Sequence, residues 1–419
     1  MKLKTELIKI ARNAQDAFRG SASISSPLKR RVLKDMSSAL MAHKNYIIAE
    51  NKKDLSQARS KGLTAAFIDR LTLNEKTISQ MSSSLSEIAK LKDPVGEIIK
   101  SWKTLVGLNI QKVRVPIGVI AIIYESRPNV TSDCIGLCFK SGNSVILRGG
   151  SESLKSNLAI FEVLRKVLKI HRINENLINM ITTADRKAVD ELLKLDAYID
   201  LVMPRGGEAL IRKVAQISRI PVIKHYKGIC HVYVDKYADL NQALQICLNA
   251  KVQRPGVCNA MESMLVHQDI AAKFLPVMAK IFNNAKVQLR GCAKTLQLAP
   301  FAKAAIEKDY HTEYLGLILS VKVVRDIHQA IRHVNYYGSH HSDSIISKNK
   351  ANVKEFLRLV DSACVYANAS TRFTDGNQFG MGAEIGISTD KLHARGPMAL
   401  EELTTYKYVI HGNGQVRSS

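Results

Sequence analysis

The sequence Ile117-Gly-Val-Ile-Ala-Ile-Ile123 decides the fold class, because it is a continuous apolar run made mostly of β-branched residues. Such a run predicts a strand that is covered on both faces, as in a parallel sheet. The apolar stretch that contains it, 115–124, is too short to span a bilayer. Further short apolar runs follow at 144–147, 177–181, 199–203 and 221–224.

Helical patterns separate these runs along the chain. Apolar residues at every third or fourth position predict a helix over 153–169, and similar patterns predict helices over 186–195 and 208–217. Strands that alternate with helices indicate a parallel, Rossmann-like sheet. Ligands of such sheets gather beyond the carboxyl ends of the strands.

A second α/β region and an arm complete the predicted architecture. The second region is indicated by a strand at 231–235, a helix at 240–250 and strands at 264–266, 317–321 and 344–346. Two alternating segments, 101–115 and 404–410, predict an antiparallel arm. An exposed edge of this kind is a natural oligomer contact. At the N-terminus, residues 2–18 predict an amphipathic helix rather than a signal peptide.

Charge and cysteine usage limit the function classes. The chain of 419 residues carries a formal net charge of +24, which favours either nucleic-acid binding or an enzyme with polyanionic ligands. The basic residues are spread along the whole chain without interleaved aromatics, so a solvated basic surface is the simpler interpretation. Seven scattered cysteines without a CxxC pair indicate reduced thiols, and we expect a cytoplasmic protein.

Two glycine turns follow predicted strands. They are Arg148-Gly-Gly-Ser-Glu152 and Pro204-Arg-Gly-Gly207. Glycines at a strand-to-helix turn let backbone N–H groups approach an anion, and an adjacent arginine adds a donor suited to phosphate. The alternative is a tight turn with a purely conformational need for glycine. A GxGxxG fingerprint is absent.

The segment Val252-Gln-Arg-Pro-Gly-Val-Cys-Asn-Ala260 is a candidate nucleophile loop. Pro255-Gly256 predicts an irregular turn after a helix, and a cysteine on such a turn can expose its sulfur. Arg254 nearby favours a thiolate. A buried, inert thiol is the alternative that the local sequence leaves open.

The whole chain resembles the gamma-glutamyl phosphate reductases, a family within the aldehyde dehydrogenase superfamily. The stretches that carry the resemblance are 115–131, with Glu125-Ser-Arg-Pro-Asn129, the nucleophile loop 252–260, 337–345, with Tyr337-Gly-Ser-His-His341, and 372–384, with Arg372-Phe-Thr-Asp-Gly376. The resemblance implies the fold of the superfamily: α/β and aldehyde-dehydrogenase-like, with a Rossmann-type cofactor domain, an α/β catalytic domain and a β-hairpin oligomerisation arm.

The resemblance also implies roles for individual residues. Cys258 matches the catalytic nucleophile, and Asn129 matches the asparagine whose amide helps to form the oxyanion hole. The positions that match cofactor-binding residues are Arg148, Gly149, Ser151, Arg205, Gly206, Gly207 and Glu313. The candidates for binding the substrate's phosphate or carboxylate are Arg254, Arg372 and His341.

From this resemblance we expect NADPH-dependent reduction of L-glutamyl 5-phosphate to L-glutamate 5-semialdehyde, the second step of proline synthesis, through a cysteinyl thioester. The partners implied are this small substrate and further copies of the chain, as a dimer or tetramer, without nucleic acid or membrane. One rival is a hydrolytic NAD-dependent aldehyde dehydrogenase, but residues 225–229 lack the acid that would activate water. The other rival is a basic nucleic-acid-binding protein that keeps the fold.

The expected domains follow from the same comparison. The NADP-binding domain comprises 1–100 and 116–229, with a return segment near 376–400. The catalytic domain comprises 230–375, and the oligomerisation arm comprises 101–115 and 401–419.

Some residues in the matching stretches have plainer interpretations. His341 and Asp343 lie in a His-His-x-Asp pattern, which we interpret as a hydrogen-bonded loop rather than a metal site. Cys134 and Cys138, one helical turn apart, are predicted to be core residues. Gly316 stands where the family often has an acid, which leaves the local cofactor geometry open.

Overall fold

The computed structural model describes residues 2–125 and 127–417. The chain divides into two compact units. The first comprises the residues up to Lys224, Gly380–Gly386 and the residues from Met398. The second comprises His225–Phe379 and Ile387–Pro397. No helix of the described residues is both long enough and apolar enough to cross a membrane.

The first unit is built on a parallel four-stranded sheet with the strand order β5-β4-β3-β6. The strands are β3 (Val119–Tyr124), β4 (Ser144–Arg148), β5 (Ile178–Met180) and β6 (Leu201–Arg205). The chain runs from β3 outward to β5 and then returns to the other side of β3. The switch point therefore lies between β3 and β6, where ligands of doubly wound sheets bind.

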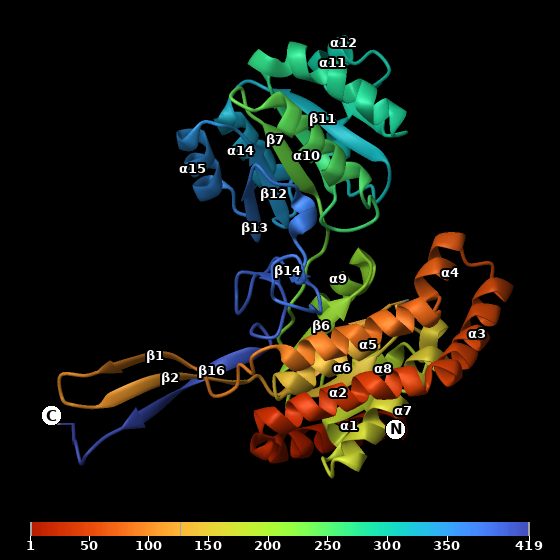
Figure 1. The fold of residues 1–419 in the computed structure, drawn as a ribbon, viewed down its shortest axis with the longest axis vertical. Helices are drawn as coiled ribbons and strands as arrows, with labels where there is room; N and C mark the ends of the chain where they lie inside the picture. Colours follow the sequence, from red (N-terminus) through yellow and green to blue (C-terminus); the bar gives the residue numbers. More distant parts are fainter. Residues whose placement is uncertain (1, 126, 418–419) are drawn as a thin grey trace. The chain divides into compact units, whose positions relative to one another are not determined.

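Helices cover this sheet on both faces (Figure 1). Those on one face share a buried cluster with alternate residues of β3 and are α1 (Lys2–Gly20), α8 (Lys187–Leu192) and α9 (Glu208–Ile217). Those that contact the other side are α6 (Val130–Lys140) and α7 (Leu154–Ile170). Further helices pack outside these two: α2 (Ser26–Ala42), α3 (Lys44–Ser60) and α5 (Glu75–Lys90). The short helix α4 (Ala65–Leu71) packs against α3.

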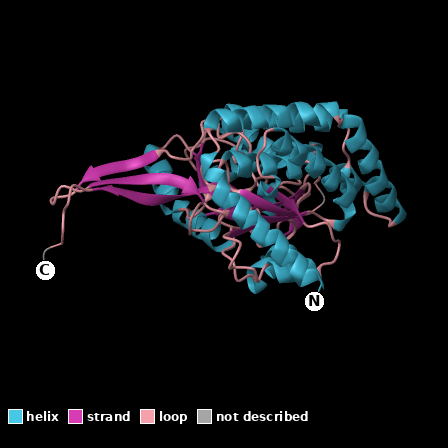
Figure 2. Cartoon of the chain, turned by 90° about the horizontal axis from the view of Figure 1, so that it is seen from below, coloured by secondary structure: helices cyan, strands magenta, loops and turns pink. Residues whose placement is uncertain are grey.

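The arm of the first unit is a three-stranded antiparallel sheet. A hairpin of β1 (Ile98–Lys103) and β2 (Asn109–Pro116) pairs through β2 with β16 (Thr404–His411), near the C-terminus. Figure 2 shows these three strands as an extended ribbon. The arm therefore unites the two alternating segments that the sequence singled out.

The second unit contains a parallel seven-stranded sheet with the order β10-β9-β11-β8-β7-β12-β13. Its strands are β7 (Cys230–Val234), β8 (Met261–His267), β9 (Gln288–Gly291), β10 (Lys303–Ala304), β11 (Ile318–Val324), β12 (Ser342–Ile346) and β13 (Cys364–Ala367). A short antiparallel pair, β14 (Ile387–Ser388) and β15 (Gly396–Pro397), lies apart from it.

Side chains of the central strands alternate between two cores. Val232 and Val234 of β7 enter one cluster, whereas Tyr233 enters the other. The first cluster is shared with α10 (Leu240–Val252), α11 (Gln268–Asn284) and α12 (Ala293–Leu298). The second is shared with α14 (Ile327–Tyr337) and α15 (Lys350–Leu359). Each fully buried Val, Leu or Phe contributes about 1.5 to 3 kcal/mol to the free energy of folding. The helices on both faces therefore stabilise the sheet.

One expectation from the sequence is corrected. The run 221–224 is not a strand: it makes a single bridge, Val202 to Val222, because Pro221 lacks an N–H and the chain then leaves the sheet. The two compact units divide between Lys224 and His225. Residues 225–229 bond to the second unit, through His225 to the Ile387 carbonyl and Ile229 N–H to Ser339.

Candidate active site

Cys258 lies on the loop between α10 and β8, and its side chain is partly exposed, not buried in the core. A buried ion pair joins the two ends of this loop: Lys251 Nζ lies 2.6 Å from Glu262 Oε2. Burial raises the pKa of Glu262 to about 7, although Lys251 opposes this shift. Glu262 Oε1 also accepts the N–H of Leu315, at 3.0 Å. The buried ion pair therefore holds the two ends of the loop together.

Asn259, directly after the cysteine, fixes the loop to the short helical turn η4 (Thr371–Phe373). Its side-chain amide donates to the Thr374 carbonyl at 2.8 Å, and its own carbonyl accepts the Thr371 hydroxyl at 2.8 Å. The same turn carries Arg372, whose Nε donates to Gln253 Oε1 at 2.9 Å. The loop is thus held from a second direction.

Two guanidinium groups border the loop. Burial lowers the pKa of Arg372, and the charge of Arg254 lowers it further, whereas Cys258 acts in the opposite direction. Two like charges that repel each other beside a sulfur form a suitable place for an anion. The structure therefore brings together the predicted substrate residues Arg254 and Arg372 beside the predicted nucleophile.

Gly228 packs its backbone against the backbone of Cys258. A Cβ on Gly228 would lie 1.9 Å from the Cys258 carbonyl oxygen and 2.4 Å from its Cα, so no larger residue fits without moving the nucleophile loop. The Gly228 N–H donates to Glu313 Oε1 at 2.9 Å. Glu313, the predicted ribose-binding residue, thus bonds to the glycine whose backbone contacts Cys258.

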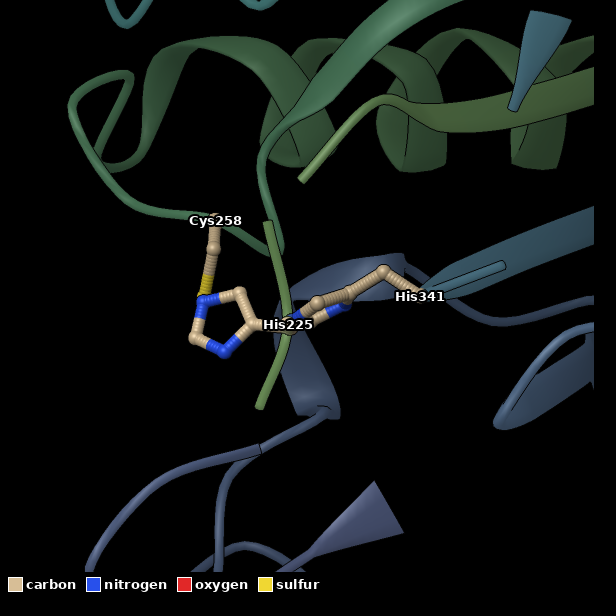
Figure 3. Close-up of side chains that lie close together, drawn as sticks. All are labelled: His225, Cys258 and His341. Atoms are coloured by element: carbon tan, nitrogen blue, oxygen red, sulfur yellow. The ribbon is translucent and has the colours of Figure 1, made fainter. Parts of the chain in front are cut away.

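Two histidines complete the cluster around the sulfur. One side-chain nitrogen of His225, one of His341 and the Cys258 sulfur all lie within 4.8 Å of one another (Figure 3). His225 precedes β7, Cys258 precedes β8 and His341 precedes β12. These three strands are neighbours, so the cluster lies at their amino ends. This is the opposite edge from the one at which ligands of parallel sheets usually gather.

The cluster of His225, Cys258 and His341 is the one group among the described residues that is close enough to share a metal ion. We interpret it as a nucleophile with imidazole partners, because a metal on the sulfur would occupy the lone pair that acyl transfer uses. Residues of the His-His-x-Asp pattern make hydrogen bonds to different partners. His340 bonds to the Asp361 carbonyl, and Asp343 bonds to His231 and Ser362.

In the first unit, Arg148 is the last residue of β4 and is buried. Two of its nitrogens donate to the carbonyls of Gly149 and Ala184, and burial lowers its pKa. Its buried Nε has no hydrogen-bond partner among the described residues. An orphaned cationic donor at the carboxyl end of a parallel sheet fits an anionic ligand. Ser151 follows in an exposed turn.

The turn Arg205-Gly206-Gly207 lies at the switch point between β3 and β6. Its Gly207 N–H donates to Glu125 Oε2 at 2.9 Å, so a carboxylate of the chain takes the place that the sequence suggested for a pyrophosphate. A Cβ on Gly206 would also meet Glu125, at 2.5 Å. The turn can offer this N–H to a ligand only when Glu125 moves.

Asn129 is the residue before α6 and is partly buried. Its side chain does not cap the helix, which leaves the amide available for another partner. Asn129 belongs to the first unit and Cys258 to the second. Cys134 and Cys138 follow on α6, and both are fully buried, as expected for core residues.

Known proteins share this arrangement of sequence and fold. A model described as the aldehyde dehydrogenase family matches residues 2–311. The chain belongs to the aldehyde dehydrogenase family. Within this family it is 53% identical over 408 residues to the gamma-glutamyl phosphate reductase of Nautilia profundicola. The aligned residues cover 97% of this chain and 99% of the relative.

Comparison with solved structures leads to the same family and fold. The crystal structure of gamma-glutamyl phosphate reductase from Thermotoga maritima is 46% identical, has a TM-score of 0.97 and covers 99% of this chain and 100% of that one. An acetylating aldehyde dehydrogenase from Geobacillus thermoglucosidasius, 16% identical, has a TM-score of 0.71 over 100% and 99% of the two chains, which shows the shared fold. The predicted aldehyde-dehydrogenase-like α/β fold and the resemblance to the reductases are confirmed.

For this member of the aldehyde dehydrogenase family, sequence reasoning had collected Cys258, Glu313, Arg254, Arg372 and His341, all of which the second unit contains. It had given no role to several further residues of the site: His225, Gly228, the side chain of Asn259 and the pair Lys251–Glu262. No sequence signal marks them, because they reach the cysteine only through the packing of separate strands.

Proposed function

We propose that this chain reduces L-glutamyl 5-phosphate to L-glutamate 5-semialdehyde and releases phosphate, the reaction of proline synthesis. The observation that carries the proposal is the partly exposed Cys258 beside two guanidinium groups. Relatives at 50 to 53% identity over nearly the full length carry the name gamma-glutamyl phosphate reductase.

The first step is acylation of the cysteine. Cys258 Sγ attacks the acyl carbon of the acyl phosphate, a carbon–sulfur bond forms, and phosphate leaves with the electrons of the broken carbon–oxygen bond. The amide of Asn129 and the backbone N–H of Cys258 would donate to the oxyanion, and one such donor contributes about 3 kcal/mol. Arg254 and Arg372 would bind the phosphate or the substrate carboxylate.

The second step reduces the thioester. A nicotinamide, when bound, would supply the hydride, and the thiohemiacetal on Cys258 would then collapse to the aldehyde and the Cys258 thiolate. The thioester must survive until then, so the carboxylates near the loop should not activate water. Glu313 accepts the Gly228 N–H, and Glu262 is paired with Lys251, which supports reduction over hydrolysis.

The cofactor of this proposal is NADPH. Arg148, Gly149 and Ser151 would hold a phosphate of the nucleotide, with Glu313 on the ribose of the nicotinamide. Arg205, Gly206 and Gly207 would meet the pyrophosphate after Glu125 moves. Support comes from the orphaned Arg148 Nε and from the positive charge of the chain, which attracts both the nucleotide and the acyl phosphate.

We also propose that the protein is cytoplasmic and forms a homo-oligomer, a dimer or tetramer, through the arm. The domains of the proposal are the cofactor domain in the first unit, the catalytic domain in the second and the oligomerisation arm. Large apolar side chains of the arm are exposed, and water favours covering them. They include Ile98, Trp102, Leu105, Tyr408 and Ile410.

The test is a phosphate-dependent assay in the reverse direction, with glutamate semialdehyde and NADP. The parent should form NADPH only when phosphate is added, and Cys258→Ala should lower the rate by at least 10³-fold with an unchanged circular dichroism spectrum. Equal rates for the parent and Cys258→Ala, or a rate independent of phosphate, would exclude this function.

A further inference from the structure

His225 is held in a single tautomer by a backbone carbonyl. Its Nδ1 lies 2.9 Å from the oxygen of Ile387, the first residue of β14. A carbonyl oxygen only accepts, so Nδ1 must carry the hydrogen of this bond. In the neutral ring, Nε2 then carries a lone pair and is the basic nitrogen.

This basic nitrogen faces the nucleophile. Figure 3 shows the imidazole of His225 with its Nε2 edge turned toward the sulfur of Cys258. The side-chain atoms concerned lie within 4.8 Å of each other, so a small rotation of the cysteine brings the thiol into hydrogen-bond range. Apo structures often show catalytic hydrogen bonds in this loosened form.

The other groups that face the sulfur are less suited to accept its proton. His341, directly before β12, is buried, and its Nδ1 bonds to Ser342 Oγ at 2.8 Å and approaches Cys230 Sγ at 3.8 Å. Burial raises the pKa of Cys230, which keeps that thiol protonated. Arg254 and Arg372 favour a negative sulfur but accept no proton.

We propose that His225 is the base that deprotonates Cys258 for its attack on the acyl phosphate, an assignment that rests on the proposed function. The thiol proton passes to Nε2 as the carbon–sulfur bond forms. The imidazolium then returns this proton to the departing phosphate, which leaves as hydrogen phosphate. When the thiohemiacetal collapses, the released thiolate takes up one proton from solvent through the same nitrogen. The Ile387 carbonyl stabilises the charged ring, because it accepts the hydrogen on Nδ1.

The test compares His225→Asn with the parent. Asparagine can still donate to the Ile387 carbonyl from about the place of Nδ1, but it has no counterpart of Nε2. At pH 7 in buffer with EDTA, iodoacetamide should alkylate Cys258 at least 10-fold more slowly in the variant, and the alkylation profile should move to higher pH. The kcat of the reductase reaction should fall about 10²-fold with little change in KM, the usual contribution of a general base.

Chemical rescue separates a base from a structural residue. In His225→Ala, added imidazole should restore alkylation and turnover in proportion to its concentration. The matched control is His328→Gln, an exposed histidine of the same unit beside Glu355, which should behave like the parent. Identical alkylation profiles for the parent and His225→Asn would overturn the proposal, and so would a loss that imidazole does not restore. Alkylation needs no substrate, so this outcome is independent of whether glutamyl phosphate is the substrate.

Discussion

Gly228 is the residue whose size should matter most to the nucleophile. Its backbone contacts the backbone of Cys258, and a Cβ would meet three atoms of that residue within 2.5 Å. Gly228→Ala should therefore displace the loop. Because a shift of about 1 Å in a reacting group costs about 10²-fold in rate, we expect kcat to fall by that order. Steady-state assays, with alkylation of Cys258 as a second readout, measure the effect.

The matched control is Gly20→Ala. A Cβ on Gly20 meets nothing within 4 Å, and the residue has a helical φ of −79°. This variant should keep the parent rate and gain a little stability, since glycine is a poor helix residue. If Gly228→Ala also keeps the parent rate, the close packing against Cys258 has no role in catalysis.

At this scale the sequence predicted Cys258 as the nucleophile and some of the residues around it, but not His225 or Gly228. The role of Cys258 was predicted from the resemblance of the chain to a family and stays a prediction, and the side chain is partly exposed. His225 was not singled out, since its meaning depends on Ile387, which lies 162 positions away along the chain. In the first unit, the sequence predicted the turn Arg205-Gly206-Gly207 but not its bond to Glu125, whose carboxylate approaches the turn only after β3 and β6 pair.

The element that supports the site is the loop between α10 and β8, and its anchor is the pair Lys251–Glu262. Both side chains are fully buried, so removing one partner leaves an uncompensated charge. Glu262→Gln keeps an acceptor for Leu315 N–H but loses the ion pair, and the variant should be destabilised by about 3 to 5 kcal/mol. Calorimetric or urea unfolding measures the change.

A double variant tests the reason for this loss. Lys251→Met with Glu262→Gln removes the stranded charge, so it should recover a large part of the stability that Glu262→Gln loses. The ion-pair account is wrong if the double variant is less stable than the single one. Activity should fall in both variants, because each loosens the loop that carries Cys258.

At the scale of elements, long periodic patterns were the most predictable. The helix expected over 153–169 is α7, Leu154–Ile170, and the strand expected over 144–147 is β4, Ser144–Arg148. Short strands at and next to the sheet edges were not foreseen: β9, β10 and β13 have two to four residues. Such segments are extended because a neighbour pairs with them, which no local pattern records.

For the whole molecule, the acid sensitivity of folding should depend on His333. This side chain is buried, and burial, with the charges of His231, Lys322 and His311, lowers its pKa to about 2. The unfolded chain binds the proton below a pH of about 6.5, but the folded chain does not. The stabilising contribution is therefore complete above pH 6.5 and is lost as the pH falls, by about 1.4 kcal/mol per pH unit.

The variant His333→Phe should remove this dependence. Phenylalanine fits among Tyr310 and Tyr337, and neither ring nitrogen of His333 has a hydrogen-bond partner among the described residues. Urea unfolding at pH 7 and pH 5 should show a smaller acid loss in the variant, by about 2 kcal/mol. If both proteins lose the same free energy of unfolding between pH 7 and pH 5, groups other than His333 cause the acid sensitivity.

The arm should control assembly. Trp102 of β1 and Tyr408 of β16, the two strands that flank β2, lie edge to face with ring centroids 6.1 Å apart, and both are substantially exposed. Replacing both by serine removes apolar surface that we expect a second copy to cover, so sedimentation velocity should show dissociation to smaller species at micromolar concentration. Parent and variant with the same sedimentation coefficient would exclude this face of the arm as the contact.

The central claim is that the glutamyl group becomes attached to Cys258. The most direct measurement is peptide mass spectrometry after glutamate semialdehyde and NADP are mixed with the enzyme without phosphate. We predict one equivalent of NADPH and a glutamyl increment on the peptide that contains Cys258, both absent in Cys258→Ala, with the increment removed when phosphate is added. NADPH formation with no acyl group on this peptide, or with the group on another residue, would contradict the account.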